Sequence, residues 1–390
     1  MIQISPETQL FIREHSSDDV RALALQAKKY PDINMPTAIT QIAGRQVAAE
    51  KIPSWREIEE IWYPKHLSLE QCSSEITARY KARLSQGDSL TDLTGGFGID
   101  CSFLATGFKS ATYVERQEEL CEIAAHNFPI LNLNHINVRN EDGVAYLQTM
   151  SPVDCIFLDP ARRNEHGGKT VAISDCEPNV AELEALLLSK ANRVMIKLSP
   201  MLDLSLALKE LKHTQEVHIL SVNNECKELL ILLGQTSPAE IAIHCVNLLT
   251  KGTQEEQHFV FTREQEQRSQ CTYTDSLGDY LYEPNTSLLK AGAFRSIAAA
   301  YPVRKLHPNS HLYTSDTFIE NFPGRIFRIV NQCSFNKKEV KENLADLKKA
   351  NVTVRNFPAT VAELRKRLHL TEGGDTYLFA STLNNGQKVI

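Results

Sequence analysis

This 390-residue chain lacks several features that would place it in a special class of protein. No apolar run approaches the length of about 18 residues that a membrane-spanning helix needs, so we expect no membrane segment. The first residues carry no basic stretch ahead of an apolar one, so we expect no secretory signal. The nine cysteines include no Cys-x-x-Cys pair, which argues against a disulfide scaffold or a zinc ribbon. We therefore expect a cytoplasmic protein without a metal site.

The composition is that of a folded protein with several domains. Hydrophobic residues make up 42% of the chain and charged residues 23%, and the length exceeds that of a typical single core. The net charge of −6 is uneven, because residues 321–390 hold twelve Lys/Arg against six Asp/Glu. A basic end on an acidic body is typical of a C-terminal module that meets phosphates, and a solvated helical surface is the alternative.

The order of expected elements predicts an α/β fold. Residues 1–87 have a helical pattern broken by prolines, and from Ser89 to Gly234 strands and helices alternate, as in a parallel sheet. The expected strands are Ser89–Leu93, Ala111–Val114, Ile136–Val138, Asp154–Leu158, Arg193–Lys197, Glu216–Val222 and Leu229–Leu233. The last two are too close for a crossover helix, so they should be antiparallel. Seven strands with a final hairpin indicate the Rossmann-like methyltransferase sheet rather than the six-stranded dinucleotide-binding sheet.

Two small α+β modules are expected after Pro238. The first should contain strands Ile241–Leu249, His258–Thr262 and Ser310–Thr314, and a helix over Thr286–Ala300. The second should contain strands Arg325–Val330, Val352–Asn356 and Tyr377–Leu383, and helices Lys337–Ala350 and Thr360–Leu368.

A glycine-rich turn follows the first expected strand. Asp92 ends that strand, and the turn that follows contains Thr94, Gly95, Gly96 and Gly98. In an open α/β sheet this is where a nucleotide-like ligand binds, and glycines let the backbone approach it closely. The spacing does not match the dinucleotide fingerprint, and the nearby Asp92 would repel a pyrophosphate. Both points favour S-adenosylmethionine, whose ammonium group needs a carboxylate, over a nicotinamide cofactor.

Acidic residues also follow the next three expected strands. Glu115 ends the second strand, where a carboxylate can accept hydrogen bonds from both ribose hydroxyls. Asp142, followed by Gly143, is placed to accept from the adenine amino group, and Asp159 ends the fourth strand. Each acid alone could equally cap a helix. Together with Asp92 they should lie along one edge of the sheet.

The segment Asp159-Pro160-Ala161-Arg162-Arg163 should lie beside the transferable methyl group. Methyltransferases that act on amino groups of bases often carry an acidic or amide residue, two prolines and an aromatic residue here. This chain keeps Asp159 and Pro160, and Arg162 could stack on a base or pair with a phosphate. The two arginines could instead pair with acids such as Glu165 or Asp175. The segment that starts at Lys197, after the fifth strand, should form another wall.

The chain resembles a known family, the class I S-adenosylmethionine-dependent methyltransferases with ferredoxin-like and THUMP-like C-terminal domains. The matching segments in the catalytic part are Asp92–Gly98, Tyr113–Arg116, Asp159–Arg163, Asp175–Pro178, Ser199–Met201 and Asn224–Glu228. Those in the C-terminal part are Tyr282–Pro284, Ser310–Asp316, Phe322–Gly324, Arg355–Pro358 and Glu372–Asp375. The resemblance covers the chain from about Leu90 to its end.

The chain is expected to have four regions and an RNA partner. The helical pattern defines an N-terminal region (1–87), and the resemblance implies a class I methyltransferase domain (88–236), a ferredoxin-like module (237–318) and a THUMP-like domain (319–390). THUMP domains bind structured RNA, commonly tRNA, which gives the basic end a role.

The first hypothesis is an S-adenosylmethionine-dependent methyltransferase that modifies a base in tRNA or rRNA. Its expected catalytic residues are Asp159, Pro160 and Arg162. Its expected cofactor-binding residues are Asp92, Thr94, Gly95, Gly96, Gly98, Glu115, Arg116, Asp142, Gly143 and Asp159. Its expected RNA-binding residues are Arg163, Arg325, Lys337, Lys338, Arg365, Lys366 and Arg367. The alternatives are a methyltransferase of a protein or small molecule and a catalytically silent RNA-binding protein.

Overall fold

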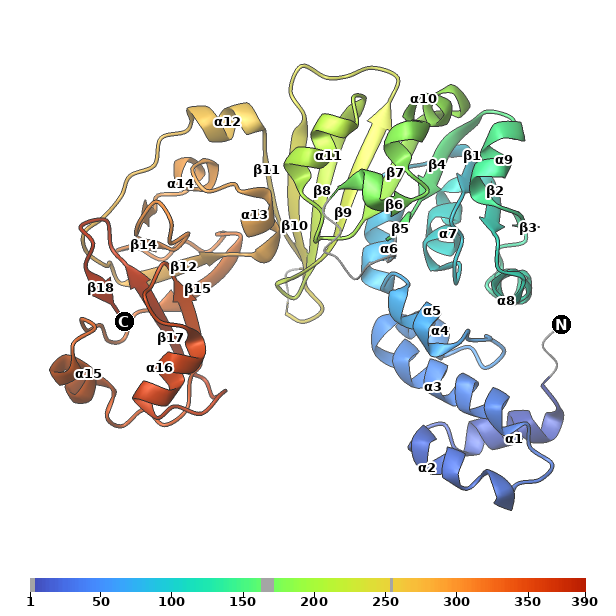
Figure 1. The fold of residues 1–390 in the computed structure, drawn as a ribbon, viewed down its shortest axis with the longest axis horizontal. Helices are drawn as coiled ribbons and strands as arrows, with labels where there is room; N and C mark the ends of the chain where they lie inside the picture. The colour runs from blue at the N-terminus through green and yellow to red at the C-terminus, as the bar shows by residue number, and fades with distance from the viewer. Residues whose placement is uncertain (1–3, 163–171, 253–254) are drawn as a thin grey trace. The chain divides into compact units, whose positions relative to one another are not determined.

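The computed structural model describes residues 4–162, 172–252 and 255–390 (Figure 1). The chain divides into two compact units, residues 1–216 with 229–238, and residues 217–228 with 239–390. Within the described ranges, no helix is both long and apolar enough to cross a membrane.

The N-terminal part of the first unit is helical, as its sequence predicts. Its helices are α1 (Pro6–Glu14), α2 (Val20–Leu25), η1 (Ala27–Lys29), α3 (Met35–Lys51), α4 (Pro53–Arg56), α5 (His66–Gln71) and α6 (Glu75–Ala82). Side chains of Ser5, Asp19 and Asn34 cap α1, α2 and α3 by accepting from backbone N–H groups, which fixes where each helix begins. Trp55 and Ile61 pack in one core cluster with Phe97 and Ile99, so the helical part is joined to the sheet by apolar contacts.

The main sheet follows the expected topology. Its strands are β1 (Gly87–Asp92), β2 (Phe108–Glu115), β3 (Ile136–Asn140), β4 (Val153–Leu158), β7 (Ala191–Leu198), β8 (Thr214–Val222), β9 (Glu225–Gly234), β10 (Ala242–Leu248) and β11 (Glu256–Phe261). Their order is β11-β10-β8-β9-β7-β4-β1-β2-β3. β1 to β4 and β7 pair in parallel, whereas β9 is antiparallel to β7. Asn223 and Asn224, both with positive φ, form the two-residue turn between β8 and β9, as a tight hairpin requires.

The expectation of a seven-stranded sheet is wrong, because the sheet has nine strands. β10 and β11, expected in a separate small module, instead continue the sheet beyond β8. An edge strand presents unpaired N–H and C=O groups to any strand that can reach it. Sequence patterns identify strands but carry no mark of which sheet edge a strand joins.

Helices connect the parallel strands. They are α7 (Ile99–Leu104), η2 (Ala105–Gly107), α8 (Glu118–Ile130), α9 (Gly143–Thr149), η3 (Ile173–Asp175), α10 (Val180–Lys190) and α11 (Leu204–Glu210). A short antiparallel pair, β5 (Ala161–Arg162) and β6 (Cys176–Glu177), lies outside the main sheet. The central strands β4 and β7 are buried over most of their length, as expected where helices cover a parallel sheet.

The rest of the second unit contains two further sheets. A four-stranded sheet has the order β13-β14-β12-β15, and a three-stranded sheet has the order β16-β17-β18. The strands are β12 (Tyr280–Pro284), β13 (Arg304–Lys305), β14 (Tyr313–Ser315), β15 (Gly324–Arg328), β16 (Asn351–Arg355), β17 (Tyr377–Thr382) and β18 (Lys388–Val389). The helices are α12 (Arg263–Arg268), α13 (Thr286–Ala291), α14 (Ser296–Ala300), α15 (Lys337–Leu344) and α16 (Val361–Leu368).

Three sequence expectations in this unit need correction. The helix expected over Thr286–Ala300 is two helices, because Gly292 has φ +79 and ends α13 in the left-handed region. The helix expected over Lys337–Ala350 ends at Leu344. β12 was not expected, yet it is the strand that pairs with both β14 and β15.

Candidate functional site

The glycine turn after β1 is held to the end of β4. The backbone N–H of Thr94 donates to Oδ1 of Asp92 at 3.0 Å, and the Thr94 hydroxyl accepts from the backbone N–H of Asp159 at 2.6 Å. Thr94 therefore ties together two of the strand ends that the sequence places at one edge.

Three glycines in this turn are explained by a close approach or by a positive φ. A Cβ at Gly95 would lie 2.2 Å from Cε2 of Tyr113, whose ring is fully buried. Gly98 has φ +85 and is the residue before the first turn of α7. Gly96 also has positive φ, and its carbonyl accepts from the Tyr113 hydroxyl. The turn therefore packs closely against the sheet, and the side of the turn that faces away from the sheet is left for a ligand.

Glu115 at the end of β2 is fixed by the same turn. Its Oε2 accepts from the backbone N–H of Gly96 at 3.0 Å, and its Oε1 accepts from the N–H of Gln117 at 2.9 Å. The residue is 9% exposed. Each carboxylate oxygen can accept a second hydrogen bond, so Glu115 is oriented by the backbone while keeping capacity for two hydroxyl groups.

Asp142 has a structural role at the start of α9. Its Oδ1 accepts from the N–H groups of Val144 and Ala145, both at 3.0 Å, so it caps α9. The next residue, Gly143, approaches the first turn closely, because a Cβ there would lie 2.2 Å from the carbonyl oxygen of Leu93. The turns after β1 and β3 therefore meet, as the candidate adenine site requires.

Asp92 is the most unusual group at this edge. It is fully buried, and its Oδ2 has no hydrogen-bond partner among the described residues. Burial raises the pKa of Asp92 well above its usual value, and the nearby carboxylates of Asp100, Asp159 and Glu115 raise it further. A buried carboxylate oxygen in this state needs either a proton or a cationic donor.

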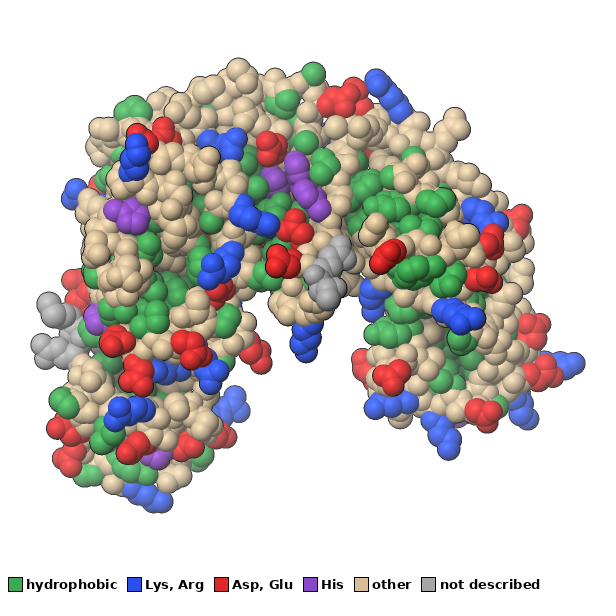
Figure 2. All heavy atoms as spheres, turned by 180° about the vertical axis from the view of Figure 1, so that it is seen from behind, with side chains coloured by type: hydrophobic (Ala, Val, Ile, Leu, Met, Phe, Trp, Pro, Cys, Tyr) green, Lys and Arg blue, Asp and Glu red, His purple; other side chains and the backbone are tan. Residues whose placement is uncertain are grey.

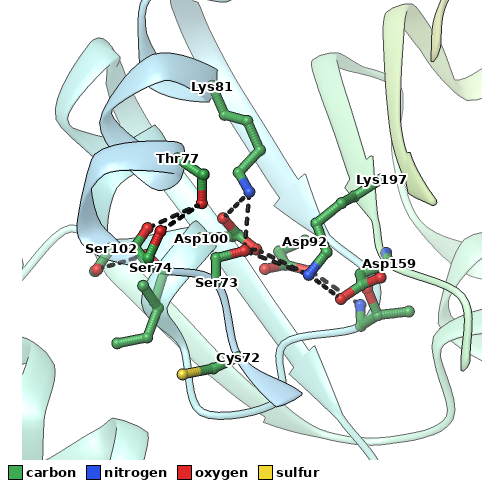
Figure 3. Close-up of polar contacts among 12 residues, drawn as sticks. Cys72, Ser73, Ser74, Thr77, Lys81, Asp92, Asp100, Ser102, Asp159 and Lys197 are labelled. Carbon is green, nitrogen blue, oxygen red and sulfur yellow. Dashed lines mark hydrogen bonds and ion pairs between the residues drawn. The ribbon is translucent and has the colours of Figure 1, made fainter. Parts of the chain in front are cut away.

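Asp159 and Asp100 share a network with two lysines (Figure 3). Nζ of Lys197, at the end of β7, forms an ion pair with Oδ2 of Asp159 and lies 3.7 Å from Oδ2 of Asp100. Lys81 of α6, which is completely buried, pairs with Oδ1 of Asp100 at 2.8 Å. Ser73 joins the group, since its hydroxyl lies 2.7 Å from Asp100 and 2.8 Å from Lys81.

The pKa values of the two aspartates in the network are shifted in opposite directions. Burial alone would raise the pKa of Asp100, but Lys81 and Lys197 outweigh it and hold the pKa below its usual value. At Asp159 burial outweighs Lys197 and the pKa is raised. With Asp92 included, three carboxylates face two ammonium groups, so the cluster has room for one more positive charge or one proton.

The residues of this edge fit S-adenosylmethionine. The buried Oδ2 of Asp92 can accept from the ammonium group of its methionine part, and Glu115 can accept from a ribose. Because Gly95 and Gly96 have no side chains, the turn leaves space there for a ligand. The donor is cationic, which matches the charge that the cluster lacks.

Some predicted site residues are placed elsewhere or are not described. The Arg116 guanidinium is mostly exposed and lies 3.6 Å from a carboxylate oxygen of Glu177. Pro160 is buried directly after Asp159. The Arg162 backbone is in β5, and Arg163 lies outside the described residues.

The N-terminal helices contribute residues that no sequence pattern indicates as functional. Lys81 and Ser73 lie in the N-terminal region, whose sequence has no pattern typical of a catalytic or binding site. Asp100 is at a position where an acidic residue is common, the first turn of a helix. A signal for Lys81 does exist, because it lies three residues after the apolar Ala78 and so on the same face of α6. A lysine on the apolar face of a helix is rarely buried without a partner.

The basic residues expected to bind RNA have different surroundings. Arg325 pairs with Glu283, a buried carboxylate that also pairs with Arg355, and Arg365 lies 3.0 Å from Glu372. Among the remainder, the exposed residues are Lys337, Lys338, Lys366 and Arg367. Arg367 stacks over Phe335 with its guanidinium carbon 4.1 Å from the ring centre. Arg325 thus has a clear structural partner, and the four exposed residues are the better candidates for phosphate contacts.

We expect Asp92→Asn to stabilise the protein at neutral and alkaline pH. Because the folded-state pKa of Asp92 is raised, the native carboxyl holds its proton more tightly than the unfolded one. Its contribution to stability is present in acid and is lost as the pH rises through the folded pKa. Removing the charge should raise the free energy of unfolding at pH 8 by about 1–3 kcal/mol. Urea unfolding at pH 4 and pH 8 measures this, and a gain that is equal at both pH values would contradict it.

Comparison with known proteins gives two domain matches in the C-terminal part of the chain. Residues 280–323 match the model of a ferredoxin-like domain, and residues 324–390 match a THUMP-like domain. No curated protein matches. A solved structure from Porphyromonas gingivalis W83, provisionally assigned as a methyltransferase, is 35% identical with a TM-score of 0.87. The match covers 100% of this chain and 98% of that one.

Two weaker matches cover only part of the chain. An rRNA methylase from Streptococcus thermophilus is 14% identical over 42% of this chain and 95% of its own, with a TM-score of 0.31. A provisionally assigned methyltransferase from Streptococcus mutans, in complex with S-adenosylhomocysteine, is 13% identical over 41% and 96%, with a TM-score of 0.30. The full-length match and the two domain matches decide the family. The chain belongs to the class I S-adenosylmethionine-dependent methyltransferase family with ferredoxin-like and THUMP-like C-terminal domains.

Proposed function

We propose that this protein transfers the methyl group of S-adenosylmethionine to a base in structured RNA, either tRNA or rRNA. The observation that carries the proposal is the fully buried Asp92, whose Oδ2 has no partner in the described part of the chain, beside a turn that admits only glycine at position 95. An orphaned buried carboxylate costs stability, which is expected where a cationic ligand completes the site.

The residues divide into those that hold the donor and those that face the acceptor. Asp92 accepts from the ammonium group, Glu115 from the ribose hydroxyls, and Asp142 with Gly143 lies at the adenine. Thr94, Gly95, Gly96 and Gly98 shape the surface between them. Arg116 stays a candidate at the ribose end, where its guanidinium lies beside Glu177.

Bound S-adenosylmethionine supplies an electrophilic methyl group. This chain contributes the acceptor side through Asp159 and Pro160, with Arg162 as the candidate to stack on the base. The Asp159 carboxylate accepts a hydrogen bond from the attacking amine and orients it, while the ion pair with Lys197 holds the carboxylate in place. Positioning of this kind supplies a large part of the acceleration in a transfer that needs little acid–base chemistry.

RNA is the proposed substrate because of the C-terminal region. Residues 324–390 match a THUMP-like domain, and exposed basic side chains lie on α15 and α16. Binding through such residues is electrostatic and largely independent of sequence. We also propose that the chain divides into domains after residues 87, 236 and 318. The last of these domains, residues 319–390, would bind the RNA.

Two measurements test the proposal. Calorimetry should detect binding of S-adenosylhomocysteine to the purified protein, and labelled methyl from S-adenosylmethionine should enter total RNA from a strain that lacks the gene. Absence of binding would overturn the proposal. Binding with label in protein or in small molecules would favour a different substrate class, and RNA binding without cofactor binding would indicate a catalytically silent protein.

We expect Lys337→Gln combined with Lys338→Gln to weaken RNA binding and its salt dependence. Each lost phosphate contact should reduce the slope of log affinity against log salt by about 1. The matched control is Lys28→Gln with Lys29→Gln, which removes the same charge from two exposed residues near α2. Filter binding from 50 to about 200 mM salt gives the slope. Equal slopes for the two double variants would show that Lys337 and Lys338 make no phosphate contact.

A further inference from the structure

Three histidines gather on the outer strands of the main sheet. They are His218 on β8, His244 on β10 and His258 on β11, and these strands are neighbours in the order β11-β10-β8. Figure 2 shows a group of histidine side chains together on the face that it displays. His218 is 2% exposed, His244 is half-buried and His258 is exposed. No part of the proposed methyl transfer uses them.

The spacing of two ring nitrogens is that of a shared metal ion. Nδ1 of His244 and Nε2 of His258 lie 3.2 Å apart. Two nitrogens that bind zinc at about 2.0–2.1 Å with a tetrahedral angle between them are separated by about 3.3–3.4 Å. The register places Val246 opposite His258, so His244 and His258 are diagonal neighbours on one face of the β10–β11 pair.

The third histidine, His218, and a carboxylate lie close to His244. The rings of His218 and His244 stack with their centres 4.3 Å apart. Ligand atoms of Glu216, His218 and His244 all lie within 4.8 Å of one another. Glu216 is two residues before His218 on β8, so the two side chains share a face of that strand. Imidazole and carboxylate are the ligands typical of zinc and similar divalent ions.

We propose that His218, His244 and His258, with Glu216, bind a divalent transition-metal ion of the zinc class. Such an ion would join three adjacent strands, including the edge strand β11. If all four residues bind the ion, the ligand set is closed, as in structural zinc sites. The expectation of no metal rested on cysteine spacing, and ligands contributed by separate strands leave no such spacing in the sequence.

The first experiment measures metal binding to the full chain. The protein is treated with a chelator, and zinc is titrated in competition with a chromophoric indicator. We expect one tight equivalent per chain, a higher melting temperature with zinc, and, with cobalt in place of zinc, the visible absorption of a tetrahedral nitrogen and oxygen site. The absence of a tight equivalent would overturn the proposal and leave His244 and His258 as a hydrogen-bonded pair.

Single variants locate the ion. His244→Ala and His258→Ala should each weaken zinc binding by more than about tenfold, since even a residue that only supports a metal ligand is worth about 10–100-fold. His258 is exposed, so its variant should fold even if His244→Ala does not. His66→Ala is the matched control, because that side chain is 62% exposed on α5. Unchanged binding in His258→Ala would place the ion elsewhere and overturn the proposal.

Discussion

Asp159→Asn should abolish most methyl transfer while leaving S-adenosylhomocysteine binding intact. The amide keeps the size of the side chain but removes the negative charge that Lys197 holds in place and that orients the acceptor amine. Loss of a group that positions a reactant costs about 100-fold in rate. Transfer of labelled methyl to RNA measures the rate, and calorimetry measures the binding.

The control for this variant lies on the same strand. Asp154→Asn makes the same chemical change at the opposite end of β4, where Oδ2 of Asp154 accepts from the backbone N–H groups of Asp88 and Ser89. Its transfer rate should stay near that of the natural protein. If Asp159→Asn were as active as Asp154→Asn, the acceptor would have to bind elsewhere.

Gly95→Ala should remove cofactor binding. The new Cβ would lie 2.2 Å from Cε2 of Tyr113, and that ring is buried and packs edge-on against Phe128 at 5.5 Å between centres. Because the ring cannot retreat, the turn has to move, and it carries with it the Gly96 N–H that orients Glu115. We expect about 100-fold weaker S-adenosylhomocysteine binding, the scale of loss that a displacement of about 1 Å causes in a positioned site. Overpacking should also lower the free energy of unfolding by about 1–3 kcal/mol.

Two further variants separate the clash from a general effect of alanine. Gly386→Ala adds a Cβ at φ +87 with nothing within 4 Å, so it introduces backbone strain without a clash and should bind the ligand normally. Adding Tyr113→Leu to Gly95→Ala should recover part of the affinity, because the smaller side chain makes room for the turn. Normal binding by Gly95→Ala alone would show that the ligand does not lie against this turn.

The sequence predicted the parallel part of the sheet and the acidic residues at its strand ends well, because both depend on local patterns. Alternating strands and helices identify a parallel sheet, and the ends of β1, β2 and β4 follow from where each apolar run stops. The acids Asp92, Glu115 and Asp159 come directly at those ends, so their common edge follows from strand direction. The glycines were placed correctly for the same reason, since a tight turn has to follow β1. Their roles with a cofactor stay predictions.

Contacts between residues that are far apart in the sequence could not be predicted. Lys81 reaches Asp100, which Lys197 also approaches, only when α6 packs beside the sheet, and its charge is then held in a buried ion network. Strands β10 and β11 are recognisable as strands, yet only folding shows that they extend the main sheet and bring His218, His244 and His258 together. The sequence by itself determined the Rossmann-like class, the glycine turn and the acidic strand ends, because these follow from periodicity and residue type. The tertiary structure alone decided which charges are paired, which carboxylate is left without a partner and which strands share a sheet, because each depends on contacts between residues far apart in the chain.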